Sequence, residues 1–175
     1  AWWFIALLWI FRFPTAVPRP LAAAVGAVVL LPAWLALDLV YRANPSWLLF
    51  MLIIVWAADV GAYFAGKRFG RVKLAPQISP GKTWEGVLGG LLLVAVFAVL
   101  GARYFGRPFG IMLPFCLAIG MISVVGDLTV SIFKRAAGIK DSGRLFPGHG
   151  GLLDRIDSVT AAAPLFALGT GWAGL

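Results

Sequence analysis

The chain alternates between long apolar stretches and short polar ones. Asp, Glu, Lys and Arg are absent from residues 20–37, 43–58, 86–102, 109–126 and 158–175. A helix needs about 17–25 apolar residues to cross the hydrocarbon core of a bilayer, and only helices or closed barrels satisfy the backbone there. These stretches do not alternate apolar and polar residues as barrel strands do. The pattern therefore predicts an all-α, polytopic transmembrane bundle with about six spans, near residues 1–12, 21–41, 46–66, 86–104, 109–131 and 158–175.

The predicted spans form one membrane-embedded domain over residues 1–175. The chain opens inside an apolar run, residues 1–11, and its first arginine follows that run. A secretory signal would instead begin with basic residues. We therefore expect residues 1–12 to complete a span that begins upstream, with further N-terminal spans before it.

The distribution of charge predicts an orientation for this bundle. Only 13% of the residues are charged, against about 25% in a typical soluble domain. If the spans alternate, the loops at 13–20, 67–85 and 132–157 share one side, and with Arg12 they carry 12 of the 15 Lys and Arg residues. Cytoplasmic loops are enriched in these residues. We expect an integral protein of a bacterial inner (plasma) membrane whose active site faces the cytoplasm, with basic loops that meet anionic lipid rather than nucleic acid.

A first polar segment begins with Asp59 inside an apolar span. A carboxylate near the membrane centre costs about 2.5–3.5 kcal/mol even on the lenient insertion scale. It therefore lines a polar cavity or forms an ion pair with a basic residue of another helix, and both options stay open. The nearby Gly61 and Gly66 favour close packing of two helices.

Residues 79–86 continue this first segment with a serine, a proline and a lysine–threonine pair. Lys82, Thr83 and the free N–H groups of a following helix are typical of an anion contact. The alternative is an ordinary helix start, with Ser79 as N-cap, Pro80 at N1 and Glu85 in the early turns. Both can hold together.

The second polar segment, residues 126–157, carries denser chemistry. Asp127, Ser131 and Lys134 are spaced i, i+4, i+7 and share one helix face, while Asp154 and Asp157 are spaced i, i+3 on the next helix. Carboxylates from two helices, framed by lysine and arginine, suit Mg²⁺ that bridges to a polyphosphate, because Mg²⁺ prefers a few carboxylates plus phosphate oxygens and water. We expect Asp59 and residues 79–85 to form the other wall of this site.

The glycine-rich turn at 147–151 lets backbone N–H groups approach a phosphate closely, because glycine has no side chain to block it. His149 lies in this turn. A lone histidine without Cys or His partners is not a zinc site. We favour a hydrogen bond from His149 to phosphate, and a purely structural role in the turn is the alternative.

These residues resemble the phosphatidate cytidylyltransferases, or CDP-diacylglycerol synthases. The resemblance rests on Ser131-x-Phe133-Lys134-Arg135, then Lys140-Asp141-x-Gly143, then Phe146-Pro147-x-His149-Gly150-Gly151-Leu152-x-Asp154-Arg155-Ile156-Asp157. Asp127 stands where that family has its other metal-binding aspartate, and residues 59–63 and 79–86 resemble the family's second block.

The resemblance implies the reaction of CTP with phosphatidic acid to give CDP-diacylglycerol and pyrophosphate in phospholipid synthesis. The resemblance also implies that the reaction requires Mg²⁺. A second cation in the site and a homodimeric protein are further options. Asp127, Lys134 and Asp154 would be catalytic, with Asp127 and Asp154 as the metal ligands. The implied substrate-binding residues are Asp59, Ser79, Lys82, Thr83, Glu85, Ser131, Arg135, Lys140, Asp141, His149, Gly150, Gly151, Arg155 and Asp157.

Two alternatives come from other classes of protein. A CTP-dependent polyprenol or phytol kinase is also membrane-bound and metal-dependent, but the long match over 140–157 argues against it. In an ion-coupled transporter, Asp59 and Asp127 would bind the coupling ion. Transporters often carry an internal repeat with paired broken helices, and this chain shows none.

Overall fold

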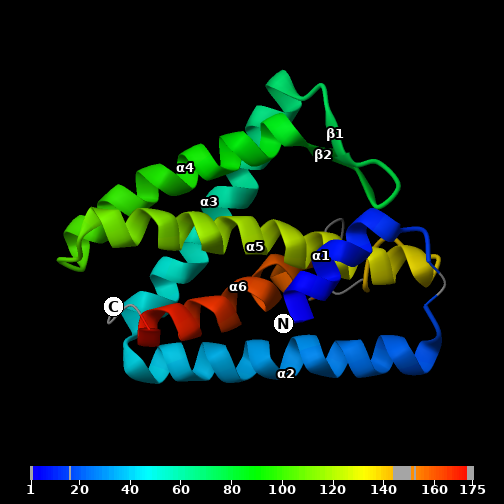
Figure 1. The fold of residues 1–175 in the computed structure, drawn as a ribbon, viewed down its shortest axis with the longest axis horizontal. Coiled ribbons are helices and arrows are strands. Elements are labelled where there is room, and N and C mark those ends of the chain that lie inside the picture. Colours follow the sequence, from blue (N-terminus) through cyan, green and yellow to red (C-terminus); the bar gives the residue numbers. More distant parts are fainter. Residues whose placement is uncertain (1, 16, 144–150, 152, 173–175) are drawn as a thin grey trace.

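The computed structural model describes residues 2–15, 17–143, 151 and 153–172. Helices dominate these residues, with one small hairpin of two strands (Figure 1). The elements in chain order are α1 (Trp2–Arg12), α2 (Arg19–Ala43), α3 (Pro45–Phe69), β1 (Lys73–Ala75), β2 (Ser79–Thr83), α4 (Trp84–Tyr104), α5 (Phe109–Ala136) and α6 (Leu153–Trp172). The predicted all-α bundle is confirmed.

Within the described ranges, four helices are long and apolar enough to cross a membrane: Pro20–Ala43, Pro45–Phe69, Trp84–Tyr104 and Phe109–Ala136. They match four of the six predicted spans. The 11 residues of α1 are shorter than the roughly 17 that a span needs. Helix α6 begins at Leu153 rather than at residue 158, so Asp154 and Asp157 lie on its first turns.

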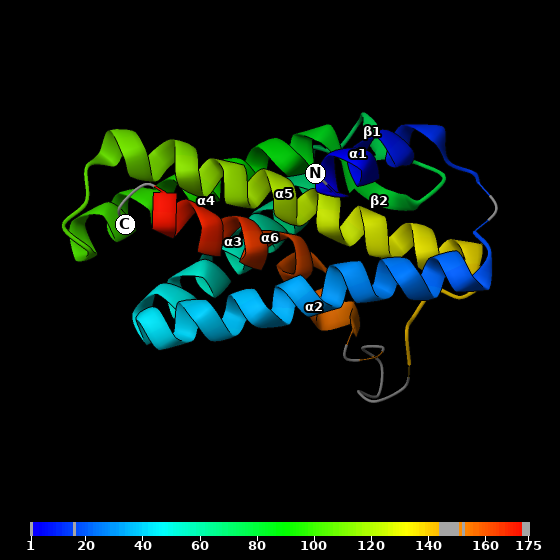
Figure 2. The ribbon, with the colours of Figure 1, turned by 60° about the horizontal axis from the view of Figure 1, so that its bottom comes forward.

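The connections between the helices lie at two opposite ends of the molecule, as expected if successive spans alternate in direction. The start of α2, the β1–β2 hairpin and the end of α5 lie toward one end of the molecule, at the right of Figure 1. The α2–α3 and α4–α5 turns lie toward the other end, and the view in Figure 2 agrees. The basic residues therefore concentrate at the hairpin end.

Helices α3 and α4 approach each other closely along a run of small residues. A Cβ added at Gly90 would lie 2.5 Å from the carbonyl oxygen of Ala58, and one at Gly61 would lie 2.8 Å from that of Gly89. Only residues without a side chain permit this backbone approach. The packing role predicted for Gly61 is confirmed, and Gly66 faces Gly86 on the same seam.

The segment expected to open a helix forms a strand instead. Ser79–Thr83 pairs antiparallel with Lys73–Ala75, with Lys73 opposite Thr83. The helix begins later, at Trp84, because the extended Thr83 takes the capping position and its Oγ1 accepts the N–H of Gly86 at 3.1 Å. Ser79 and Pro80 as N-cap and N1 were therefore the wrong assignment.

The hairpin docks on the C-terminal half of α5 through a small apolar cluster. Ala75 and Ile78 pack against Leu128 and Ile132 of α5. The Nε of Arg135 also donates a hydrogen bond of 3.1 Å to the carbonyl oxygen of Ile78. This docking fixes the position of β2, which carries the residues described next.

Candidate active site

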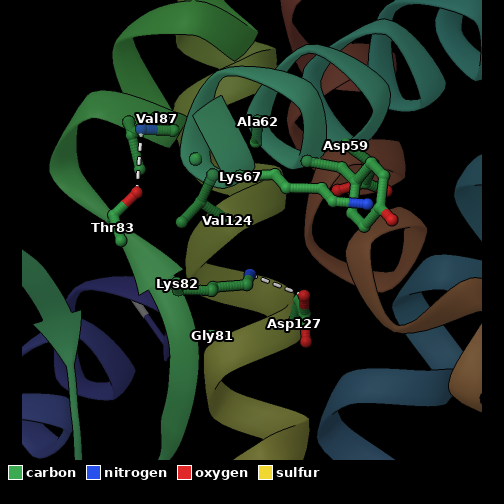
Figure 3. Close-up of a pocket in the computed structure, with 12 residues that line it drawn as sticks. Asp59, Ala62, Lys67, Gly81, Lys82, Thr83, Val87, Val124 and Asp127 are labelled. Atoms are coloured by element: carbon green, nitrogen blue, oxygen red, sulfur yellow. Dashed lines mark hydrogen bonds and ion pairs between the residues drawn. The ribbon is translucent and has the colours of Figure 1, made fainter. Parts of the chain in front are cut away.

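A cavity of about 430 Å³ lies between α3, β2, the start of α4 and α5. Figure 3 shows its charged residues arriving from three elements that are distant in sequence. The lining residues are Asp59, Ala62, Tyr63, Gly66 and Lys67 of α3, Gly81, Lys82 and Thr83 of β2, Gly86 and Val87 of α4, and Val124 and Asp127 of α5.

Lys82 joins the two polar segments of the sequence. Its Nζ lies 2.5 Å from Oδ2 of Asp127, and each side chain is 24% exposed. The other carboxylate oxygen of Asp127 accepts a hydrogen bond from Ser131 Oγ at 3.3 Å, as their i, i+4 spacing predicts. Asp127 therefore already faces a cation that the hairpin supplies.

Asp59 lies in the same cavity and connects it to α6. Its Oδ1 is 3.4 Å from the hydroxyl of Ser158, which donates the hydrogen bond. Asp127 and Lys82 both act on Asp59 electrostatically. Of the two options for this intramembrane carboxylate, the structure supports the polar cavity, because no basic residue in the described part of the chain forms a direct ion pair with it.

A second lysine–carboxylate pair lies where α5 meets α6. Lys134 Nζ is 2.9 Å from Asp154 Oδ1 and 3.7 Å from Asp157 Oδ2, and the three side chains are only 10–13% exposed. The remaining oxygen of Asp154 accepts hydrogen bonds from the N–H and Oγ of Ser142 at 2.8 and 3.0 Å. It also accepts the N–H of Gly151 at 2.8 Å.

One of these contacts differs from the expected role. The N–H of Gly151 was expected to face a phosphate, but it donates to Asp154, because the glycine starts the turn into α6 next to that carboxylate. A Cβ on Gly151 would lie 2.7 Å from Ser142 Oγ. Glycine here serves the close approach of two chain segments.

Asp157 lies between the two pairs. Asp127, Lys134 and Lys82 all act on it electrostatically. It reaches this position because α5 and α6 are in close contact at Gly126, where a Cβ would lie 2.9 Å from the carbonyl oxygen of Asp157. The two lysine–carboxylate pairs therefore belong to one continuous polar region.

Three predicted site residues make contacts within the scaffold. Glu85 lies outside the cavity, because both of its carboxylate oxygens accept the N–H of Val72, at 3.1 and 3.3 Å, at the start of the hairpin. Ser79 pairs with Ala75 in the hairpin. Arg135 holds the hairpin through the carbonyl of Ile78.

The other predicted residues fall into three groups. Lys140 and Asp141 are exposed in the turn after α5, and Arg155 is exposed on α6. His149 and Gly150 lie outside the described residues. Thr83 lines the cavity with its side chain almost fully buried.

Sequence reasoning missed two cavity residues, Tyr63 and Lys67. The Nζ of Lys67 lies 5.7 Å from the centroid of the Tyr63 ring. Their spacing was the available signal, since Asp59, Tyr63 and Lys67 stand at i, i+4 and i+8 and so share one helix face.

The carboxylates of the site can be compared with what a Mg²⁺ ion needs as ligands. Within the described residues, no group of three or more His, Cys, Asp or Glu side chains is arranged to hold a metal ion. Mg²⁺ commonly takes only one or two carboxylates together with substrate phosphates and water. The oxygens of Asp127, with an ammonium at 2.5 Å, fit such a partial site.

Comparisons with known proteins show which family the chain resembles. A family model described as the cytidylyltransferase family matches residues 1–170. A phosphatidate cytidylyltransferase of Pseudomonas aeruginosa is 45% identical over 176 residues, and one of Haemophilus influenzae is 42% identical over 186 residues. Each alignment covers 95% of this chain and 65% of the relative. One from Synechocystis is 54% identical over 118 residues, which cover 63% of this chain and 38% of the relative.

This chain therefore spans just under two thirds of the length of the first two relatives. The family model nonetheless runs through all six helices and both polar segments. The chain belongs to the cytidylyltransferase family.

Proposed function

We propose that the protein transfers the cytidylyl group of CTP to phosphatidate, giving CDP-diacylglycerol and pyrophosphate for phospholipid synthesis. The observation that carries this proposal is the convergence of Lys82–Asp127 and Lys134–Asp154 in one polar region of a membrane-spanning bundle. The relatives of similar sequence are phosphatidate cytidylyltransferases, which supports the same reaction.

The reaction needs alignment and charge neutralisation more than acid–base chemistry. A phosphate oxygen of the lipid attacks the α-phosphorus of CTP, and pyrophosphate leaves. A phosphomonoester is largely dianionic at neutral pH, so its oxygen needs no general base. Both reactants are anionic, and fixed cations that stabilise the developing charge supply most of the catalysis in such transfers. Lys82 and Lys134 are the fixed cations of this site.

We propose that Mg²⁺ is held by Asp127 and Asp154, with Asp157 next to them. The ion, when bound, offsets the charge of the triphosphate. Among the residues that the structure describes, Asp127 accepts from two groups. A carboxylate has about four lone-pair positions, so it has capacity for a further cation. Asp154 already binds Lys134, Ser142 and Gly151, so it also holds the start of α6 in place.

We further propose that the hairpin end faces the cytoplasm of a bacterial inner membrane. The support is that the loops at 13–20, 67–85 and 132–157, with Arg12, carry 12 of the 15 Lys and Arg residues of the sequence, together with the positive-inside rule. CTP then enters from water while the acyl chains of the lipid remain in the bilayer.

The decisive assay follows the label of CTP into lipid. With phosphatidate and Mg²⁺ in detergent, [α-³²P]CTP should label the lipid product and [γ-³²P]CTP should label only pyrophosphate. Lipid labelled from the γ position would establish a kinase and overturn the proposal. Asp127→Ala should abolish transfer while the protein remains folded, as judged by size-exclusion chromatography.

The matched control is Asp38→Ala. Asp38 pairs with Arg42 at 2.7 Å near the C-terminal end of α2. The Asp38→Ala protein should retain activity within about twofold of the wild type, because exposed ion pairs contribute little to stability. Full activity of Asp127→Ala would refute the metal assignment and leave the reaction itself standing.

A further inference from the structure

The cavity between α3, β2 and α5 combines a charged part and an apolar part. Asp59, Asp127 and Lys82 form the charged part, while Ala62, Val87 and Val124 line the rest. Figure 3 shows the side chains of Lys67 and Lys82 extending into this space from α3 and β2. Such a cavity suits a molecule with an anionic head and an apolar body.

The two lysines differ in how their charge is compensated. Lys82 contacts Asp127 directly. Lys67 lies over the face of Tyr63, and within the part of the chain that the structure describes no carboxylate is within ion-pair distance of its Nζ. A ring attracts an exposed ammonium weakly, whereas a phosphate forms a charge-assisted hydrogen bond with it. Lys67 is therefore the cation of this cavity that is ready to receive an anion.

The surroundings of Lys67 indicate which phosphate it receives. It lies in the last turn of α3, a helix long enough to span a membrane. Phe64 of α3 and Leu88 of α4 are 66% and 65% exposed on the same pair of helices, and in a bilayer such residues face lipid. A lipid can place its phosphate at Lys67 while its chains remain along α3 and α4.

The triphosphate has a different set of partners. Lys134, Asp154 and Asp157 lie at the α5–α6 junction, and none of them lines this cavity. We expect the two anionic reactants to bind in two subsites that meet at Asp127, because an in-line transfer needs their reacting atoms close together and aligned.

We propose that Lys67 binds the phosphate monoester of the lipid substrate, and that Tyr63 is a positioning residue that holds the ammonium in the cavity. This inference rests on the proposed function for the identity of the lipid. It assigns to α3 the recognition of the lipid headgroup, a role outside the polar segment at 126–157.

The test compares Lys67→Met with Arg68→Met in the labelled-CTP assay, using mixed micelles of phosphatidate. Arg68 is the next residue, is exposed, and lies over Phe69 at 5.6 Å without lining the cavity. Loss of one charge-assisted hydrogen bond corresponds to roughly a tenfold or greater effect. Lys67→Met should raise the KM for phosphatidate about tenfold and change the KM for CTP less than twofold, and Arg68→Met should change neither. Lys67→Arg should restore most of the affinity.

Tyr63 is tested by substitutions that separate ring from hydroxyl. Tyr63→Phe keeps the ring under the ammonium and should raise the KM for phosphatidate less than Tyr63→Leu does. Tyr63→Leu should raise this KM about threefold, a fraction of the Lys67→Met effect, because only the weaker cation–π contact is removed. Equal effects of the two substitutions would refute the positioning role.

A binding measurement keeps the inference separable from the reaction. Native mass spectrometry can compare retention of phosphatidate with that of diacylglycerol of the same chains. The wild type should prefer phosphatidate, and Lys67→Met should lose that preference. A KM increase for CTP instead, or an unchanged preference, overturns the inference while the reaction stands. Preference for phosphatidate without cytidylyl transfer would overturn the proposed function and leave the Lys67 site standing.

Discussion

Substitution of Gly90 by alanine tests how tightly α3 and α4 hold the active site. The added Cβ would lie 2.5 Å from the carbonyl oxygen of Ala58 and 3.3 and 3.4 Å from its C and Cα atoms. All three atoms belong to the backbone, so no side chain can move aside. Increasing the contact from 2.5 Å to the 3.4 Å at which ordinary van der Waals contact begins requires α4 to withdraw by about 0.9 Å.

Two opposing terms set the stability of this variant. Overpacking of a well-packed contact costs about 1–3 kcal/mol. Replacement of glycine by alanine inside a helix contributes about 0.5–1 kcal/mol in the favourable direction. The matched control is Gly26→Ala in α2, where an added Cβ meets nothing within 4 Å and only the favourable term applies. We expect Gly90→Ala to be less stable than Gly26→Ala by about 1–3 kcal/mol.

The catalytic effect should exceed the loss of stability. Asp59 directly follows Ala58, and Lys82 is held just before the start of α4, so a shift of α4 moves the two walls of the cavity apart. A misplacement of about 1 Å can lower a rate on the order of 100-fold. We therefore expect Gly90→Ala to lose about 10- to 100-fold in kcat under conditions where it is fully folded, and Gly26→Ala to lose none.

The assay combines thermal unfolding in detergent, followed by tryptophan fluorescence, with turnover of labelled CTP well below the unfolding midpoint. A Gly90→Ala protein that matches Gly26→Ala in both measurements would refute the reasoning, because it would mean that the helices separate without consequence for the site.

Two other substitutions separate the roles of the lysine–carboxylate pairs. Asp154→Ala should abolish transfer. It should also lower the free energy of unfolding by about 3–5 kcal/mol, because it leaves the nearly buried Lys134 without its closest carboxylate. An equilibrium unfolding curve that matches the wild type would contradict the structural role of Asp154. Lys82→Met should reduce turnover. In the absence of nucleotide, lower concentrations of Mg²⁺ should stabilise this variant than the wild type, because the ammonium no longer competes for Asp127. The melting temperature measured at increasing Mg²⁺ concentration tests this expectation. A half-maximal Mg²⁺ concentration equal to or higher than that of the wild type would contradict the competition.

Helical periodicity explains what could be predicted from the sequence. The uncharged stretches place α2 to α5 because a span in lipid tolerates few charges. The spacing of Asp127, Ser131 and Lys134 places them on one face because that face repeats every 3.6 residues. Gly61 could be assigned to packing for a similarly local reason. Each of these inferences needs only one helix.

The inferences that failed depend on two segments at once. Ser79 looks like an N-cap when residues 79–86 are considered alone, and the strand forms because residues 73–75 lie opposite it. Residues 79–86 alone also do not show that the Glu85 carboxylate accepts the N–H of Val72. Lys67 is a different case, because one helix was enough to place it: its spacing from Asp59 puts both residues on the same face of α3, and both line the cavity.

The pairing of lysines with carboxylates reflects the cost of charge near a membrane. A lone ammonium or carboxylate near the membrane centre is energetically costly, so the proposed site for anions and Mg²⁺ has to be nearly neutral before either one binds. Lys82 against Asp127 and Lys134 against Asp154 meet this requirement. In the proposed site, each lysine would leave its carboxylate when a substrate phosphate binds the lysine and Mg²⁺ binds the carboxylate. Binding of metal and of anionic substrate should therefore be mutually favourable, because either one alone leaves an unpaired charge behind. Lys67, exposed at the end of α3, can remain without a carboxylate because water still reaches it there.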